Sequence, residues 1–270
     1  MKVPEFSMFS ARRRRAATTT VVAALVGGAA TVATVATVAT VATVAFAAPL
    51  GAQTGTGDST ALAGLPLREL PVAVAGHRLV FLITGDGGYA AGDRGMAETF
   101  AGQGIPVVVL NSRSYLSPKK TPDEAAADAA RIMVHYMEAW QRDSVVLVGY
   151  SRGADMAPFI VTRLPDSTRS HLSLVAMIGL ADHASFEFHW SDIVKDTRRA
   201  TDLPVSPEVM KIRGVRMLCL YGAHEKGSLC PTFPSSVLAV DKHGGKHSLS
   251  GGDGAAVAQR VMRELEVSTR

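Results

Sequence analysis

The sequence predicts an α/β fold with a mostly parallel central sheet and helices on both faces. The first sign is the segment at residues 77–84, HRLVFLIT, whose continuous apolar run LVFLI is typical of a parallel strand covered on both sides. The second is that segments with helical periodicity alternate with such runs along the rest of the chain. Strands that alternate with helices are joined by right-handed crossovers, so the strands lie parallel.

The expected elements follow in chain order. A helix that Asp93 can cap ends near Gly102 and precedes a strand at 105–110. Thr121-Pro122-Asp123-Glu124 combines a capping box with proline at the first helical position, and predicts the clearest helix of the chain. Its apolar face carries Ala129, Ile132, Met133, Tyr136, Met137 and Trp140. Further strands are expected at 145–148, 172–180, 215–221 and 236–240, and a further helix at 152–164.

The first 47 residues are expected to be an export signal. A run of four arginines, Arg12 to Arg15, precedes an uncharged Ala/Val/Thr stretch that ends in an A-x-A cleavage site at Ala45–Ala47. Because the apolar stretch is longer than usual for a signal peptide, an uncleaved membrane anchor is the alternative. We expect residues 48–65 to be a flexible lead-in, residues 66–270 to form a single domain, and the protein to lie in the periplasm.

The net charge gives no indication of a nucleic-acid partner. The formal charge is +4, and the first 47 residues, with five basic side chains and one acidic one, account for all of it. The remainder is neutral and has no basic stripe interleaved with aromatic residues.

Ser151 is the candidate nucleophile. It lies in Gly149-Tyr150-Ser151-Arg152-Gly153, between an expected strand and an expected helix. This is the G-x-S-x-G context in which small flanking residues allow a sharp turn that exposes the serine hydroxyl. A serine that merely caps the following helix is the alternative.

A serine hydroxyl needs a base to remove its proton and an acid to orient that base, and here both should follow it in the chain. Glu225 comes directly after the strand that ends at Tyr221, and Asp182 is its competitor. His247 is the expected base and His243 the second choice, because both follow the last expected strand. The two glycines between these histidines argue against a helical zinc-binding pair, so no metal is expected.

The oxyanion hole is expected from two backbone segments. Arg152 follows the nucleophile, and the loop Gly85–Gly88, with Asp86 and Gly87, follows the first long strand. The same loop loosely fits a dinucleotide-binding G-x-G-x-x-A pattern. That reading is disfavoured because the next strand ends at Asn111 where an acidic residue would be needed, so no cofactor is expected.

Cys219 and Cys230 are the only two cysteines. Export into an oxidising compartment would allow them to form a disulfide, and two free buried thiols are the alternative.

Several separated motifs together resemble the AcvB/VirJ family of bacterial periplasmic serine hydrolases over about residues 78–265. They are Thr84-Gly85-Asp86-Gly87-Gly88-Tyr89, Lys120-Thr121-Pro122-Asp123, Gly149-Tyr150-Ser151 with Gly153-Ala154-Asp155 and Pro158, Arg163-Leu164-Pro165, Phe186-Glu187-Phe188, and Tyr221-Gly222 with Glu225 and Cys230. The length is similar to that of the short VirJ form. The chain departs from the family at Arg152, where an aromatic residue is usual, at Tyr89, where tryptophan is usual, and around His247.

The resemblance implies an α/β-hydrolase fold and hydrolysis of aminoacylated phosphatidylglycerol, chiefly the lysyl form, at the membrane surface. It also implies a link to type IV secretion and virulence. The alternatives are a non-catalytic partner of a secretion machine and a carboxylesterase of other specificity. The candidates for binding the substrate, including its ammonium groups, are Asp86, Tyr89, Asp155, Glu187 and Asp253. The segment 181–214, with Phe186, Phe188 and Trp190, is expected to be a lid that touches lipid, or else to supply ordinary core aromatics.

Overall fold

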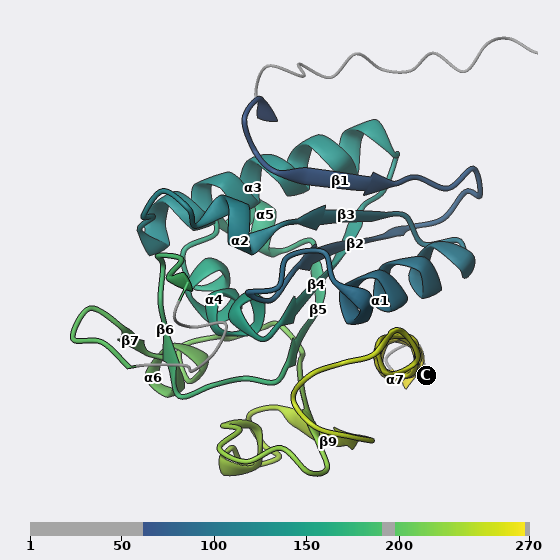
Figure 1. The fold of residues 1–270 in the computed structure, drawn as a ribbon. Helices are drawn as coiled ribbons and strands as arrows, with labels where there is room; N and C mark the ends of the chain where they lie inside the picture. The colour runs from purple at the N-terminus through teal and green to yellow at the C-terminus, as the bar shows by residue number, and fades with distance from the viewer. Residues whose placement is uncertain (1–61, 191–197, 268–270) are drawn as a thin grey trace, which may run out of the picture. The chain divides into compact units, whose positions relative to one another are not determined.

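The computed structural model describes residues 62–190 and 198–267, and they are built on a seven-stranded sheet (Figure 1). The strand order is β1-β3-β2-β4-β5-β8-β9, with β1 antiparallel to β3 and all the other pairs parallel. The strands are β1 (Leu67–Leu70), β2 (Arg78–Ile83), β3 (Val107–Leu110), β4 (Ser144–Tyr150), β5 (Leu172–Ile178), β8 (Met217–Gly222) and β9 (Ala239–His243).

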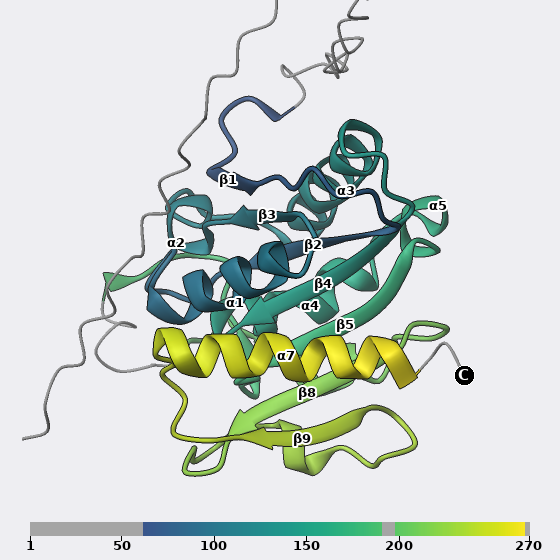
Figure 2. The same cartoon turned by 90° about the vertical axis from the view of Figure 1, so that its right-hand side faces the viewer.

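Helices cover both faces of this sheet. α1 (Ala91–Gly102) and α7 (Gly251–Val267) lie on one face, and α3 (Pro122–Ala139) and α4 (Arg152–Val161) lie on the other (Figure 2). Side chains of β2 alternate between the two layers: Val80 and Leu82 join the core under α1 and α7, whereas Phe81 joins the core under α3 and α4. The predicted α/β architecture, a mostly parallel central sheet with helices on both faces, is confirmed.

Shorter elements complete the described chain. They are α2 (Ser112–Tyr115), α5 (Asp166–Arg169), the antiparallel pair β6 (His183–Ala184) and β7 (Leu203–Pro204), and α6 (Val205–Val209). None of the helices in the described part of the chain is long and apolar enough to cross a membrane. The predicted export signal lies outside the described residues.

The helix predicted from the capping box forms as expected. The Thr121 hydroxyl accepts the N–H of Glu124 at 3.1 Å, and the Glu124 carboxylate accepts the N–H of Thr121 at 2.7 Å. These two bonds satisfy backbone donors that a helix start would otherwise leave unpaired.

Other boundaries differ from the prediction. The last strand is predicted at 236–240 but runs from Ala239 to His243. It is an edge strand whose side chains alternate in exposure, so it lacks a continuous apolar run. Leu238, which lies before it, packs into the core. β1 and α7 were not predicted. Helix α4 ends at Val161, three residues before its expected end. Asp93 caps α1 from the third helical position and not from the position before the helix. Leu62, expected in the flexible lead-in, is buried in the core.

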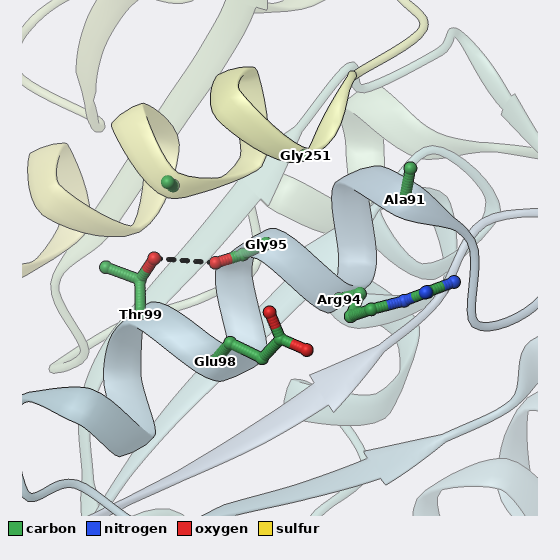
Figure 3. Close-up of a pocket in the computed structure, with 7 residues that line it drawn as sticks. Ala91, Arg94, Gly95, Glu98, Thr99 and Gly251 are labelled. Carbon is green, nitrogen blue, oxygen red and sulfur yellow. Dashed lines mark hydrogen bonds between the residues drawn. The ribbon is translucent and has the colours of Figure 1, made fainter.

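Glycines bring α1 and α7 unusually close together, and Figure 3 shows the crossing at Gly95 and Gly251. A Cβ atom on Gly95 would lie 2.1 Å from the carbonyl oxygen of Gly251, and one on Gly254 would lie 2.1 Å from that of Gly92. The Thr99 hydroxyl donates a hydrogen bond of 2.6 Å to the Gly95 carbonyl beside this contact. Since the obstructing atoms are backbone atoms, a side chain at either position must push the helices apart.

We therefore predict that Gly95→Ala or Gly254→Ala lowers the free energy of unfolding by about 1–3 kcal/mol, the usual cost of overpacking. Gly102→Ala at the end of α1 is the matched control, since its Cβ would meet nothing within 4 Å. Helix propensity should make that control neutral or more stable by up to about 1 kcal/mol. Chemical denaturation of the three variants tests this, and equal stability of all three would contradict it.

The two cysteines form a disulfide between β8 and the 3-10 turn at Cys230–Thr232, and both are fully buried. The bridge closes an 11-residue separation that contains Glu225. It therefore links the loop after β8 to the sheet.

Reduction of this bridge should lower the free energy of unfolding by about 3 kcal/mol on the chain-entropy model. Thermal unfolding with and without dithiothreitol measures the effect. The double variant Cys219→Ala/Cys230→Ala is the control, because its melting temperature should not respond to the reductant. A native protein that is equally indifferent to dithiothreitol would show that the bridge does not stabilise the fold.

Candidate active site

The three predicted residues Ser151, Glu225 and His247 meet at the carboxyl edge of the sheet. Each stands just beyond a parallel strand: Ser151 after β4, Glu225 after β8 and His247 after β9. The carboxyl ends of parallel strands share one edge, so residues distant in the sequence are brought into contact there.

Ser151 sits on a sharp turn with φ 52° and ψ −116°, a backbone conformation that side chains rarely adopt. Its N–H donates to the carbonyl of Ile178 in the neighbouring strand at 2.8 Å. The two flanking glycines are required by close approach. A Cβ atom on Gly149 would lie 2.3 Å from the carbonyl oxygen of Gly153, and one on Gly153 would lie 2.1 Å from that of Ile83.

A continuous chain of hydrogen bonds joins the three side chains. His247 Nε2 lies 2.8 Å from Ser151 Oγ, and His247 Nδ1 lies 2.7 Å from Glu225 Oε1. The other carboxylate oxygen of Glu225 accepts the N–H of Gly222 at 2.8 Å. Burial alone would raise the pKa of Glu225, but the hydrogen bonds from His247 and Gly222 outweigh it and hold that pKa below its usual value. Glu225 is therefore a carboxylate at neutral pH.

Two residues that sequence reasoning missed hold the histidine in place. The Tyr150 hydroxyl donates to the carbonyl of His247 at 3.0 Å and accepts the N–H of Leu249 at 3.2 Å. Gly179, at φ 69°, leaves room for the imidazole, since a Cβ there would lie 2.7 Å from His247 Cε1. Tyr150 occupies the variable position of G-x-S-x-G, and Gly179 directly follows β5. In the sequence, the only signal for either residue is this position at the carboxyl end of a strand.

The competing acid and base lie elsewhere. Asp182, with 57% of its side chain exposed, contacts His183 Nδ1 at 2.6 Å and Arg198 at 3.4 Å. His243 is the last residue of β9, not a residue beyond it as expected, and its Nδ1 faces the Gly244 carbonyl at 2.7 Å. The structure thus brings Glu225 and His247, and neither competitor, to Ser151.

The expected oxyanion loop also borders Ser151. Arg152 begins α4, and its side chain, 4% exposed, donates to both carboxylate oxygens of Asp86 at 2.9 and 3.1 Å. This bidentate pair links the Gly85–Gly88 loop to the start of α4. These are the two segments whose backbone N–H groups are predicted from the sequence to form the oxyanion hole.

A pocket of about 310 Å³ opens beside Ser151 and His247. Its walls come from the Gly85–Gly87 loop, the start of α1, Tyr150 and the segment after His247. The lining residues are Gly85, Asp86, Gly87, Ala90, Gly92, Asp93, Tyr150, Ser151, His247, Ser248 and Leu249. From the sequence, only a helix-capping role is predicted for Asp93. Asp93 lines the pocket because it lies in the first turn of α1, and this turn forms part of the pocket wall.

Most of the predicted substrate-binding residues do not line this pocket. Tyr89 lies under the guanidinium of Arg68, in a separate depression. Asp155 is buried and accepts the N–H of Ala181 at 2.8 Å, and Glu187 contacts Lys119 at 3.9 Å. The Asp253 carboxylate accepts the N–H of Ser250 at 3.0 Å, at the start of α7. Asp86 is the one member of that set among the lining residues of this pocket.

The aromatic segment expected to form a lid is divided. Phe186 is buried and packs edge-on against Phe159, as an ordinary core residue does. Trp190 is 69% exposed and stacks with the guanidinium of Arg113 at 4.4 Å. Residues 191–197, in the middle of the expected lid, lie outside the described residues. No group of three or more His, Cys, Asp or Glu side chains within the described ranges is arranged to hold a metal ion.

Solved structures share this fold at low sequence identity. Est1E from Butyrivibrio proteoclasticus superposes with a TM-score of 0.53 at 11% identity, over 76% of this chain and 96% of its own. MenH from S. aureus gives 0.53 at 12% identity, over 76% and 99%. The esterase domain of a Rhodothermus marinus protein gives 0.50 at 13% identity, over 73% and 90%. At such identities the likeness shows the fold alone.

Sequence comparison identifies the family. A search of curated protein sequences gave no match. The family model described as bacterial virulence protein (VirJ) matches residues 77–269, which include the G-x-S-x-G turn with Ser151, the Glu225 loop and His247. Because this match spans most of the chain, and the fold agrees with it, the protein belongs to the VirJ family.

Proposed function

We propose that the protein is an exported serine hydrolase that cleaves the aminoacyl ester of an aminoacylated phosphatidylglycerol through an acyl-enzyme intermediate. The observation that carries the hydrolase assignment is the continuous hydrogen-bonded chain from Ser151 Oγ through both nitrogens of His247 to the buried Glu225 carboxylate. Because the Glu225 carboxylate accepts the Nδ1–H of His247, Nε2 is left unprotonated and can accept the proton of the Ser151 hydroxyl.

In the first half of the reaction, Ser151 Oγ attacks the ester carbonyl carbon while its proton passes to His247 Nε2. The imidazolium that forms is stabilised by Glu225, and the N–H groups of Arg152 and the Gly85–Gly88 loop face the developing oxyanion. When the tetrahedral intermediate collapses, His247 returns the proton to the departing glycerol oxygen. The products of this half are free phosphatidylglycerol and an aminoacyl group esterified to Ser151.

In the second half, water attacks the acyl-enzyme carbonyl and gives one proton to His247. Collapse of the second intermediate releases the amino acid and returns that proton to Ser151. Every proton therefore passes through one imidazole, and Glu225 stays ionised throughout, in keeping with its lowered pKa.

The substrate class and the location rest on the family resemblance. The predicted export signal would deliver the enzyme to the periplasm, where the outer surface of the inner membrane carries such lipids. The pocket is small and open beside Ser151, which suits an aminoacyl head group better than a long acyl chain. The competing function is attachment to a secretion machine without catalysis. It does not explain why Ser151, His247 and Glu225 are joined by hydrogen bonds.

Replacing Ser151, His247 or Glu225 by alanine should each lower kcat/KM for lysyl-phosphatidylglycerol by several orders of magnitude. The double variant Ser151→Ala/His247→Ala should be little worse than either single variant, because groups that act as one unit are not additive. Release of lysine from lipid vesicles measures the effect, and thermal melts establish that the variants fold.

His243→Ala is the internal control, since His243 lies in the same region but contacts Gly244 and not Ser151. It should retain most of the activity. If His243→Ala abolishes hydrolysis and His247→Ala does not, the base is misassigned. Full activity of Ser151→Ala would contradict the serine mechanism.

Export predicts that mature protein begins near Ala48, directly after the A-x-A site. N-terminal sequencing of protein from the periplasmic fraction tests this. Recovery of the intact leader in the membrane fraction would favour the anchored alternative.

A further inference from the structure

The pocket beside Ser151 has an unbalanced charge. Asp86 in its wall is bound by Arg152, and His247 is bound by Glu225. Asp93 is the other acidic residue of the lining, and none of the lining residues is Lys or Arg. The lining therefore includes one carboxylate, that of Asp93, for which the described structure shows no ion pair, and it includes no Lys or Arg.

Asp93 is 1% exposed, and only one of its two carboxylate oxygens has a hydrogen-bond partner among the described residues. Its Oδ2 accepts the N–H of Ala90 at 3.2 Å. Its Oδ1 is buried and has no hydrogen-bond partner among the described residues. Buried polar atoms are nearly always paired, and an unpaired carboxylate oxygen is costly, so this atom requires an explanation.

Burial raises the pKa of Asp93 to about 6, and nearby backbone N–H groups oppose the shift only in part. A carboxyl whose folded-state pKa exceeds its usual value stabilises the fold when protonated. That stability is present at low pH and is lost as the pH rises through about 6. At neutral pH, Asp93 is thus an ionised group that the fold holds at a cost, which is common at functional sites.

We propose that the Asp93 carboxylate binds the ammonium group adjacent to the scissile carbonyl of the substrate and so makes the enzyme selective for esters of free amino acids. The proposal rests on the serine hydrolase function above and identifies a residue that recognises the substrate. In an aminoacyl ester that nitrogen lies two bonds from the carbonyl carbon that Ser151 attacks. Ser151 and Asp93 line the same pocket of about 310 Å³, and the proposal places the scissile carbonyl and the ammonium group of one ester in that space.

A merely structural role would confine Asp93 to capping α1. The two roles differ in which substrates they affect. A lost cap would weaken hydrolysis of every ester alike, whereas a lost ammonium site would weaken only esters with a free α-amino group.

The test uses three glyceryl esters: those of lysine, Nα-acetyl-lysine and Nε-acetyl-lysine. Native enzyme should prefer the lysine and Nε-acetyl esters over the Nα-acetyl ester. Asp93→Asn keeps an oxygen that can cap Ala90 but removes the charge. It should lower kcat/KM about 10- to 100-fold for the two esters with a free α-amino group, the range for a lost hydrogen bond to a charged group. The Nα-acetyl ester should change less than about threefold.

Asp253→Asn is the matched control. Asp253 also caps a helix from its first turn, through Ser250, but it does not line the pocket. This variant should leave the ratio of the three kcat/KM values unchanged.

A second readout needs no variant. The preference of native enzyme for the free α-amino group should shrink as the pH falls below about 6, where Asp93 becomes protonated. The other ionisable groups around the pocket and Asp93 are Asp86 with its partner Arg152, Tyr89 with its neighbour Arg94, Tyr150, His247 and, near Tyr150, Glu225 and Asp253. They act on all three esters alike, so their effects largely cancel in the ratio of the kcat/KM values.

Equal losses on all three esters in Asp93→Asn, or a preference that does not change with pH, would overturn the proposal. So would a preference that depends only on the ε-amino group. If native enzyme hydrolyses none of the esters, the proposed function itself fails and the inference falls with it. Melting temperatures separate these outcomes from unfolding, because Asp93→Asn should be at least as stable as native enzyme at pH 8.

Discussion

The site depends on one backbone constraint, the left-handed conformation of Ser151 between β4 and α4. The turn is tight enough that Gly153 packs against the carbonyl of Ile83 in the adjacent strand, where no side chain fits. This contact fixes the start of α4 relative to the sheet. It therefore sets the position of the serine hydroxyl and of the Arg152 N–H together.

The partners of Ser151 are positioned by the order of the strands. β4 lies in the middle of the sheet, and β5, β8 and β9 follow it outward to one edge. Loops from β8 and β9 can therefore converge on the serine from one side, with Gly179 after β5 leaving space for the imidazole. On the other side, α1 and the Gly85–Gly88 loop close the pocket, and the glycine crossing with α7 holds α1 close to the segment that carries His247. The glycine contacts between α1 and α7 therefore both pack the core and shape the pocket.

Much of this could be predicted from the sequence, because the signals were local. The apolar runs, the capping box at Thr121 and the G-x-S-x-G turn each depend on a few consecutive residues. The chain order of nucleophile, acid and base then narrowed the acid to Glu225 or Asp182 and the base to His247 or His243, and the hydrogen bonds of the structure decide for Glu225 and His247. Helix α7 was missed because Gly251, Gly252 and Gly254 are poor helix formers, and their value lies in a contact with α1 that no local pattern reveals. Asp93 was read as a cap, which it is, but its burial in the pocket wall depends on the packing of three separate segments.

The central claim is that Ser151 is a nucleophile activated by His247, and covalent labelling tests it most directly. The native protein should react with a fluorophosphonate, and peptide mass spectrometry should place a single adduct on Ser151. Heat-denatured protein should not be labelled, and folded His247→Ala should be labelled far more slowly. If folded native protein gives no adduct at Ser151, the turn is structural and the hydrolase account is wrong.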